Sequence, residues 1–404
     1  MSTSGMAVLS VRDRWTGVGL RAFYFLFFGA VGVYVMFFAP YLRGLGFTGT
    51  DIGTVTVLGP FVGIAGTMAW TALADRRGST SRVLRWCTLA ALVPLIYLPF
   101  ATSPAEVTVA NVVHQVSAGA CVPLIDALTY GWVTRHGRDY TRVRMWGAVG
   151  GLIVVQIVGL VLSGRGDRPG DVAMPIALAC IIAMMCLLAW VLPDAPPRDE
   201  PPNLRDWAGL ARNRALQLFL LVCFLHWLCY APYDLLYGVH LRELGLSSSL
   251  LALVLVGGSV SEAAMLYLFP ILHRRLDVRP LLVVTIVVMA ARWWLLAQAH
   301  GIVPIALLQV VHGAVTAMFW GIMVQAIGHI VPERLRTTGH GLFNAVVIGG
   351  GNTLGYWLAG IGYDHFGGTT TLFHLAALGE ALPLLLLLAV GARFNKPMSS
   401  EVSP

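Results

Sequence analysis

Twelve separate runs of about 20 apolar residues occupy most of this chain. A run of this length crosses the hydrocarbon core of a bilayer as a single α-helix. Hydrophobic residues make up 57% of the sequence and charged residues only 12%, whereas a soluble domain carries about a quarter charged residues. We therefore predict an all-α, multi-pass protein of the plasma membrane, which in a bacterium is the inner membrane. The expected spans are residues 18–41, 52–74, 82–102, 107–134, 145–164, 172–192, 215–239, 250–272, 280–299, 302–331, 338–362 and 371–393.

Arginines are concentrated in every second connecting segment. With the N-terminus placed inside, the inner segments hold basic clusters such as those around Arg76 and Arg142, while the outer segments hold few basic residues, such as Arg43 and Arg242. Basic residues favour the cytoplasmic side of a membrane, so both termini are predicted to be cytoplasmic. This placement explains the net charge of +7 without a nucleic-acid partner.

The two halves of the chain are related by a direct repeat. The segment YLRGLGFTGTDIG at 41–53 aligns with HLRELGLSSSLLA at 240–252, and each copy follows the first span of its half. Six spans separate the copies, so both halves have the same membrane orientation, and we predict two pseudo-symmetric six-helix bundles. Parallel repeats with a site near the midplane are typical of transporters, although a duplicated channel or membrane enzyme would show the same pattern. The expected domains are residues 1–192, a cytoplasmic linker at 193–214, and residues 215–404 with a short cytoplasmic tail.

Several ionisable residues fall inside the predicted spans, where a charge costs on the order of 2.5–3.5 kcal/mol by insertion scales. At about 1.5 Å per residue, Glu262 and Arg292 lie roughly 18 Å into their spans and His312 roughly 15 Å. These depths are all near the midplane of a core about 30 Å thick. The sequence thus predicts a carboxylate, a guanidinium and an imidazole from successive helices at one depth. A purely structural ion pair of Glu262 with Arg292, and a packing role for His312, are the alternatives.

The loop WTALADRRG at 70–78 resembles the signature that the major facilitator superfamily carries between helices 2 and 3, with Thr71 in place of the usual first glycine. The resemblance implies the major facilitator fold and a twelve-helix transporter that works by alternating access, as a monomer and without a cofactor. It also implies a conformational latch at the inner helix ends, for which a plain positive-inside loop is the alternative. The expected latch residues are Asp75, Arg76, Gly78, Arg82 and Arg144.

Three further stretches narrow the resemblance to one branch of the superfamily. They are FYFLFFGAVGVYVMFFAPYLRGLGF (23–47), DYTRVRMWGAVG (139–150) and LHWLCYAPYDLLYGVHLRELGLSS (225–248). They are similar to phenylpropionate permeases and, further off, to nucleoside and lactose-type proton symporters. This resemblance implies transport of a small-molecule substrate together with protons.

The resemblance to lactose-type symporters implies roles for the midplane residues, because that group uses a similar set on helices 8, 9 and 10. The chain departs from the group after His312, where Val315 stands one turn on and the helix-10 carboxylate is absent. The coupled proton is therefore expected at Glu262 or Asp126, with His312 as a third candidate. Asp126 lies nearer the cytoplasmic end, and pairing with Arg142 or Arg144 is its structural alternative.

Aromatic and polar side chains on spans expected to face the pathway are candidates for substrate binding. An aromatic stripe is also the pattern of ordinary packing, which is the alternative for the aromatic candidates. For Asp234, near the outer end of its span, exposure to solvent is the alternative. Glu380, on the last span, is assigned a structural role. The glycines at 349–351 predict a bendable segment. The candidates are Arg292, Tyr24, Tyr34, Asn111, Gln115, His226, Trp227, Tyr230, Asp234, Gln309, Trp320 and Asn344.

The functional prediction is proton-coupled uptake of a small organic solute. Arg292 favours an organic acid or aromatic carboxylate, and glycosides and nucleosides stay open. Proton-coupled efflux of drugs or metabolites is the alternative, but the fifth span, GAVGGLIVVQIVGLVL, lacks the proline of the efflux signature. No H-E-x-x-H, phosphate-binding loop or Asp-rich motif occurs, so neither an enzyme nor a bound metal is expected.

Overall fold

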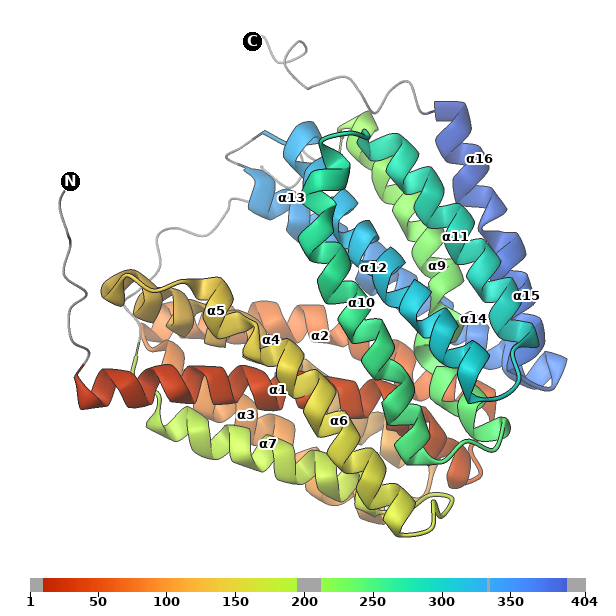
Figure 1. The fold of residues 1–404 in the computed structure, drawn as a ribbon. Coiled ribbons are helices and arrows are strands. Elements are labelled where there is room, and N and C mark those ends of the chain that lie inside the picture. The colour runs from red at the N-terminus through yellow and green to blue at the C-terminus, as the bar shows by residue number, and fades with distance from the viewer. Residues whose placement is uncertain (1–9, 195–211, 333–334, 391–404) are drawn as a thin grey trace. The chain divides into compact units, whose positions relative to one another are not determined.

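The computed structural model describes residues 10–194, 212–332 and 335–390 (Figure 1). This part of the chain is helical and contains no strand, which confirms the all-α prediction. Eleven of its helices are long and apolar enough to cross a membrane. Most of the predicted linker at 193–214 and the predicted C-terminal tail lie outside the described residues.

The first half of the chain forms long helices whose ends follow local sequence signals. Ser103 and Glu106 form a reciprocal capping box at the start of α4, and Gly137, with φ 57°, ends that helix. Within this half, α1 packs against α6 and α7, and α3 packs against α4 and α7. The elements are α1 (Val11–Gly44), α2 (Gly49–Arg77), α3 (Thr80–Tyr97), η1 (Leu98–Phe100), α4 (Pro104–His136), α5 (Tyr140–Arg144), α6 (Trp146–Gly164) and α7 (Ala173–Val191).

The second half also begins with long helices, but towards its end the predicted spans are divided into shorter helices. Here α10 packs against α12, α9 against α14, and α11 against α12 and α15 (Figure 1). Gly313 allows α12 to approach α10 closely, because a Cβ at this position would lie 1.9 Å from the carbonyl oxygen of Gly258. The elements are α9 (Arg214–Glu243), α10 (Ser248–His273), α11 (Val278–Gln298), α12 (Ile302–Ile330), α13 (Arg336–Phe343), η3 (Asn344–Gly350), α14 (Gly351–Phe366), α15 (Thr369–Gly379) and α16 (Ala381–Val390).

The span predicted at 338–362 is not one regular helix. It consists of α13, the π-helical segment η3 and α14 in succession, so it is not among the eleven long apolar helices. A π-helical turn is wider than an α-helical one and recurs at functional sites. The irregular segment ends at the three glycines singled out in the sequence, which offer no side-chain packing to hold regular geometry.

The described residues fall into two compact units. These units differ from the expected domains in one segment of the first half, residues 46–60. That segment, the first part of α2, groups with the second unit and not with the rest of the first half. Hydrogen bonds connect this segment to α14: the carboxylate of Asp364 accepts from the backbone N–H groups of Gly49 and Thr50, each at 2.7 Å.

Candidate functional site

Arg292, on α11, is buried in the second unit with only 1% of its surface exposed. Its Nε donates to the carbonyl oxygen of Leu308 at 3.0 Å, and its Nη2 donates to Oε1 of Gln309 at 3.3 Å. Both acceptors are uncharged and both lie on α12. The guanidinium is therefore held in place without any group that cancels its charge.

Two aromatic faces enclose the same guanidinium. The Cζ atom lies 4.4 Å from the ring centroid of Tyr233 and 4.6 Å from that of Trp293, both within cation–π range. Nη1 has no hydrogen-bond partner, and no carboxylate in the described parts of the chain forms an ion pair with Arg292. A buried charge without a counter-ion is costly, so its retention indicates a function.

His312, on α12, lies in the same cluster, as the depth estimate from the sequence expects. Its Nε2 is hydrogen-bonded to the hydroxyl of Tyr230 at 3.0 Å, its ring centroid lies 4.4 Å from that of Tyr233, and its Nδ1 has no partner. Tyr233 also exchanges hydrogen bonds with the side-chain amide of Gln309 at 2.8 and 3.0 Å. The structure thus brings Arg292 and His312 together around one tyrosine.

Glu262 does not pair with Arg292, so the structural ion pair considered as an alternative is not formed. The Glu262 carboxylate is half-buried on α10 and makes neither an ion pair nor a hydrogen bond with any described residue. It acts electrostatically on Tyr230. The pair is absent because the donors of Arg292 point to α12 and not to α10.

Residues of α9 supply much of the aromatic surface around this cluster. Trp227 and Tyr230 are stacked, with centroids 4.6 Å apart and planes at 8°, and Trp227 meets Trp320 edge-on at 5.9 Å. Trp293 and Phe319 complete the group at 5.7 Å from Tyr230 and 5.8 Å from Trp227. The sequence analysis missed these last two, although each directly neighbours a residue that it named.

Asp234 and Trp227 both bond to α14. The hydroxyl of Tyr356 donates to Asp234, and the indole N–H of Trp227 donates to Oδ1 of Asn352 at 2.7 Å. Asp234 is thus half-buried and bonded, not simply solvated at a helix end as considered above. Asn344, by contrast, is exposed at the start of η3.

His226 is paired with Glu380, and this pair contacts the Arg292 cluster through Trp293. Its Nδ1 lies 2.9 Å from Oε2 of Glu380, and Oε1 of Glu380 accepts from the indole N–H of Trp293 at 3.3 Å. Both members of the pair are 1% exposed. From the sequence, His226 is predicted to bind substrate and Glu380 to be structural. No sequence signal predicts that the two side chains are in contact.

In the first unit, Asp126 is bonded to tyrosines and not to arginine. Its Oδ1 accepts from the hydroxyls of Tyr24 at 2.5 Å and Tyr140 at 2.8 Å. Arg144 lies over the other side of this group, with Cζ 4.0 Å from the ring of Phe28 and 5.2 Å from that of Tyr24. The proposed pairing of Asp126 with Arg142 or Arg144 is therefore not formed.

A second polar contact in this unit joins Tyr34 to α4. The Tyr34 hydroxyl donates to Oδ1 of Asn111 at 2.9 Å, and Gln115 hydrogen-bonds to the same hydroxyl. Tyr34 also stacks on Phe38 with centroids 4.5 Å apart. These predicted substrate residues bond to one another, at a place distinct from Asp126.

The predicted latch residues do not bond to one another in the described part of the chain. Asp75, Arg76 and Arg82 are exposed and form no ion pair there, while Gly78 adopts a φ of 60°. Asp194 instead binds the start of α3: it accepts from the Ser79 hydroxyl and, at 2.8 Å, from the backbone N–H of Ser81. Arg144 stacks on Phe28, away from the loop.

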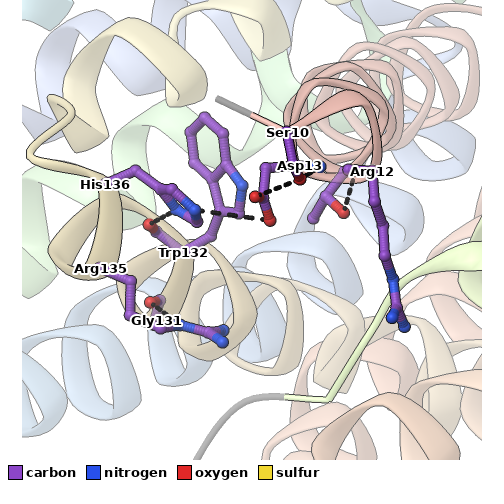
Figure 2. Close-up of polar contacts among 8 residues, drawn as sticks. Ser10, Arg12, Asp13, Gly131, Trp132, Arg135 and His136 are labelled. Carbon is purple, nitrogen blue, oxygen red and sulfur yellow. Dashed lines mark hydrogen bonds and ion pairs between the residues drawn. The ribbon is translucent and has the colours of Figure 1, made fainter. Parts of the chain in front are cut away.

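An ion pair that the sequence did not predict joins α1 to the end of α4 (Figure 2). Oδ1 of Asp13 lies 3.5 Å from Nε2 of His136, whose Nδ1 bonds to the carbonyl oxygen of Trp132 at 2.8 Å. Figure 2 also shows Ser10, whose hydroxyl accepts from the backbone N–H of Asp13 and caps α1. This contact joins the start of α1 to the end of α4.

Comparison with known proteins gives consistent similarities over most of the chain. The sequence profile of the MFS_1 like family matches residues 18–375. The maltose permease of Geobacillus stearothermophilus is 28% identical over 375 residues, which is 90% of this chain and 93% of the relative. A probable 3-phenylpropionic acid transporter of Escherichia coli (strain K12) is 25% identical over 384 residues, 93% of this chain and 96% of the relative.

Solved structures share the fold. The crystal structure of the nucleoside transporter NupG matches with a TM-score of 0.82 at 18% identity, covering 94% of this chain and 99% of NupG. A bacterial homologue of the lysosomal transporter Spinster, in an inward-facing and unoccupied conformation, matches with a TM-score of 0.74 at 13% identity, covering 96% and 97%.

Proposed function

Since the chain belongs to the MFS_1 like family of the major facilitator superfamily, and is therefore a multi-pass membrane transporter of a small solute and not an enzyme, we propose that it takes up a small organic anion together with protons by alternating access. An aromatic carboxylate is the proposed substrate class. The proposal places the carboxylate of the solute at Arg292 and its apolar body against the aromatic residues of α9.

The buried Arg292 without a counter-ion is the observation that carries this proposal. Three buried polar atoms near it lack a partner: Nη1 of Arg292, Nδ1 of His312 and the hydroxyl of Tyr237, whose ring is 4.5 Å from that of Tyr233. Buried donors are normally satisfied, so unsatisfied donors around one cation favour an anionic ligand. A carboxylate can accept two hydrogen bonds from one guanidinium.

The stacked pair of Trp227 and Tyr230 supports an aromatic solute. Aromatic rings pack on one another with a gain of about 0.5–1.5 kcal/mol beyond the buried area. The relative from Escherichia coli that is described as a probable 3-phenylpropionic acid transporter combines the same two chemical features in its ligand.

The proton carriers expected from the sequence stay part of the proposal. Glu262 has no hydrogen bond to saturate its carboxylate, whereas Asp126 already accepts two from tyrosines. His312 keeps one ring nitrogen without a partner. Of the two carboxylates, only that of Glu262 is bonded to no other side chain in the described part of the chain.

Uptake into proteoliposomes tests the proposal. We expect labelled 3-phenylpropionate to accumulate when the interior is alkaline, and Arg292→Gln to bind it about 10- to 100-fold more weakly, since a hydrogen bond to a charged group contributes about 1.5–3 kcal/mol. Uptake that ignores the pH gradient would contradict proton coupling. Outward movement of the label driven by the same gradient, with the interior alkaline, would favour the efflux alternative.

A glycoside is the second candidate, because the relative with 28% identity is a maltose permease. The flat faces of Trp227 and Tyr230 suit a sugar ring as well as a phenyl ring. Maltose and 3-phenylpropionate offered together distinguish the two: competition by maltose that survives in Arg292→Gln would favour the sugar.

We also infer twelve spans in two six-helix bundles with both termini in the cytoplasm. The α13–η3–α14 stretch then serves as the irregular eleventh span. Single cysteines at Gly78 and Gly301, in loops on opposite predicted sides, test this orientation with a membrane-impermeant thiol reagent. Labelling from outside is expected at position 301 only.

A further inference from the structure

A carboxylate and an imidazole are buried together where α15 passes into α16. Glu380 is the residue between these helices, and His226 lies on α9, which packs against both of them. Oε2 of Glu380 lies 2.9 Å from Nδ1 of His226, while Oε1 accepts from the indole N–H of Trp293 on α11. The pair is thus held by three helices of one unit.

The hydrogen-bond donors determine where protons reside. An indole N–H only donates, so Oε1 acts as an acceptor. The contact between Oε2 and Nδ1 needs one proton between these two atoms. When that proton is on Nδ1 of a neutral ring and Glu380 is ionised, the pair carries a charge of −1.

A second proton changes this balance. It adds to Nε2 of His226 and gives an imidazolium that still donates from Nδ1 to Oε2 across 2.9 Å, so the hydrogen bond is kept and the charge of the pair rises from −1 to 0. A structural contact does not need this chemistry, because replacing a buried ion pair by apolar residues is often neutral or stabilising. Two titratable groups kept inside the membrane therefore indicate a function.

Trp293 connects this pair to the anion site. The indole ring that donates to Glu380 also carries the guanidinium of Arg292 over its face, with Cζ 4.6 Å from the centroid. From α9, the Cys229 thiol is the other titratable group near Glu380, and α12 contributes the ring of Phe319 against His226 at 5.1 Å. Arg292, which contacts Glu380 through Trp293, is thus the nearest permanently charged side chain along these contacts.

We propose that the Glu380–His226 pair is a further site, beside the carriers named above, through which transport is coupled to protons, and that its proton strengthens anion binding at Arg292. The inference rests on the proposed function. A hydronium ion gives up one O–H bond and becomes water, its proton forms an N–H bond at the lone pair of Nε2, and the reverse step returns the proton to water. The added positive charge attracts the anion, and by reciprocity the bound anion raises the proton affinity by the same factor.

Infrared difference spectra of the reconstituted protein test the pair directly. Between about pH 5 and 9, the range in which a histidine pair can titrate at physiological conditions, we expect a carboxyl band that appears or shifts and that is lost in Glu380→Gln. The matched control, Asp277→Asn, removes an exposed carboxylate at the start of α11 and should keep the band. A spectrum in which Glu380 contributes no pH-dependent band would overturn the proposal.

Ligand binding tests the coupling. We expect the affinity of the wild-type protein for 3-phenylpropionate to rise about tenfold or more as the pH falls from about 9 to 5, within the usual 5- to 150-fold range of coupling. Glu380→Gln and His226→Gln should reduce this change to less than about twofold, and Glu380→Asp should restore part of it, which a purely structural role would not produce. If Glu380→Gln does not fold, His226→Gln and Glu380→Asp give the same comparison.

Transport separates this inference from the proposed function. We expect Glu380→Gln to exchange labelled 3-phenylpropionate across the membrane without accumulating it on a pH gradient. Accumulation by the variant as strong as that of the wild type would overturn the inference alone. A wild-type protein that binds no anion would overturn the proposed function, and the inference with it.

Discussion

Trp227 donates its indole N–H to Oδ1 of Asn352 at 2.7 Å, directly after the π-helical segment ends. The adjacent Gly351 lets the indole approach this closely, because a Cβ there would lie 2.8 Å from Cδ1 of Trp227. At Gly350, one residue earlier, a Cβ would meet Phe224 at an ordinary 3.5 Å. The two glycines therefore have different tolerances for a side chain.

We predict opposite effects of one methyl group at these two positions. Gly350→Ala should leave thermal stability unchanged or raise it, because alanine favours a helix by roughly 0.5–1 kcal/mol over glycine. Gly351→Ala should lower it and displace Trp227, because the indole must move. Thermal unfolding in detergent, with tryptophan fluorescence as a second readout, checks both. Equal effects of the two substitutions would contradict the packing derived for Gly351.

Arg292 should be important for transport and yet dispensable for folding. A buried charge without a counter-ion opposes stability, and an apolar side chain of similar size at this position removes that cost. We expect Arg292→Met to lose uptake of an anion while its melting temperature is unchanged or higher. Arg292→Lys should not restore transport, because an ammonium group lacks the planar fork that stacks between two rings.

A melting temperature that drops sharply in Arg292→Met would contradict this prediction. It would show that the bonds to Leu308 and Gln309 hold α11 to α12 and that the arginine is structural.

The two tyrosines that share one oxygen of Asp126 should act as a unit. Tyr24→Phe and Tyr140→Phe each remove one hydrogen bond to a carboxylate, which contributes about 1.5–3 kcal/mol. Because the same oxygen accepts both bonds, the double substitution should depart from additivity by about 0.5–3 kcal/mol. A double-mutant cycle of thermal stability measures this term. Additive effects would mean that the two hydroxyls do not share the carboxylate.

The sequence identifies Arg292 and His312 because an ionisable group in an apolar run is costly in any fold, and the helical rise gives its depth. Depth alone does not give direction around a helix axis. For this reason the similar depths of Glu262 and Arg292 are compatible with an ion pair between them. In the structure the guanidinium instead donates to α12.

Contacts between distant segments were less accessible to sequence reasoning. Glu380 and His226 are 154 positions apart, and each sits in an apolar run that offers no partner. Likewise the superfamily signature drew attention to Asp75, while Asp194 bonds to Ser79 and Ser81. The glycines at 349–351 indicated an irregular helix, but its π-helical form depends on packing that a single sequence does not encode locally.

The loop between α6 and α7 should be insensitive to mild acid. The Arg165 guanidinium, which donates to Asp171 at 2.8 and 3.2 Å, holds the pKa of that carboxyl below its usual range. A depressed pKa adds stability above the unfolded value of about 3.9, and this stability is lost as the pH falls through the folded pKa. The difference in melting temperature between the wild-type protein and Asp171→Asn should therefore be constant from neutral pH down to about 5. A difference that narrows between pH 7 and 5 would show that the bond is not kept.

Asp364 should stabilise the start of α2 across a long sequence distance. Its carboxylate accepts from the N–H groups of Gly49 and Thr50 and, at 2.6 Å, from the Thr50 hydroxyl, so a negative charge lies at the positive end of the helix. Loss of a cap costs about 0.5–2 kcal/mol, and we expect Asp364→Ala to fall in that range, with Asp364→Asn between it and the wild type.

Hydrogen exchange distinguishes this cap from the local one. Asp51 accepts from the backbone N–H and hydroxyl of Thr48, within the same turn. Asp51→Ala should therefore speed exchange at Thr48, while Asp364→Ala should speed it at Gly49 and Thr50. Because a Cβ at Gly360 would lie 2.4 Å from the carbonyl oxygen of Gly49, Gly360→Val should produce the Asp364→Ala pattern through separation of α14 from α2. Unchanged exchange at Gly49 and Thr50 in both variants would refute the long-range cap.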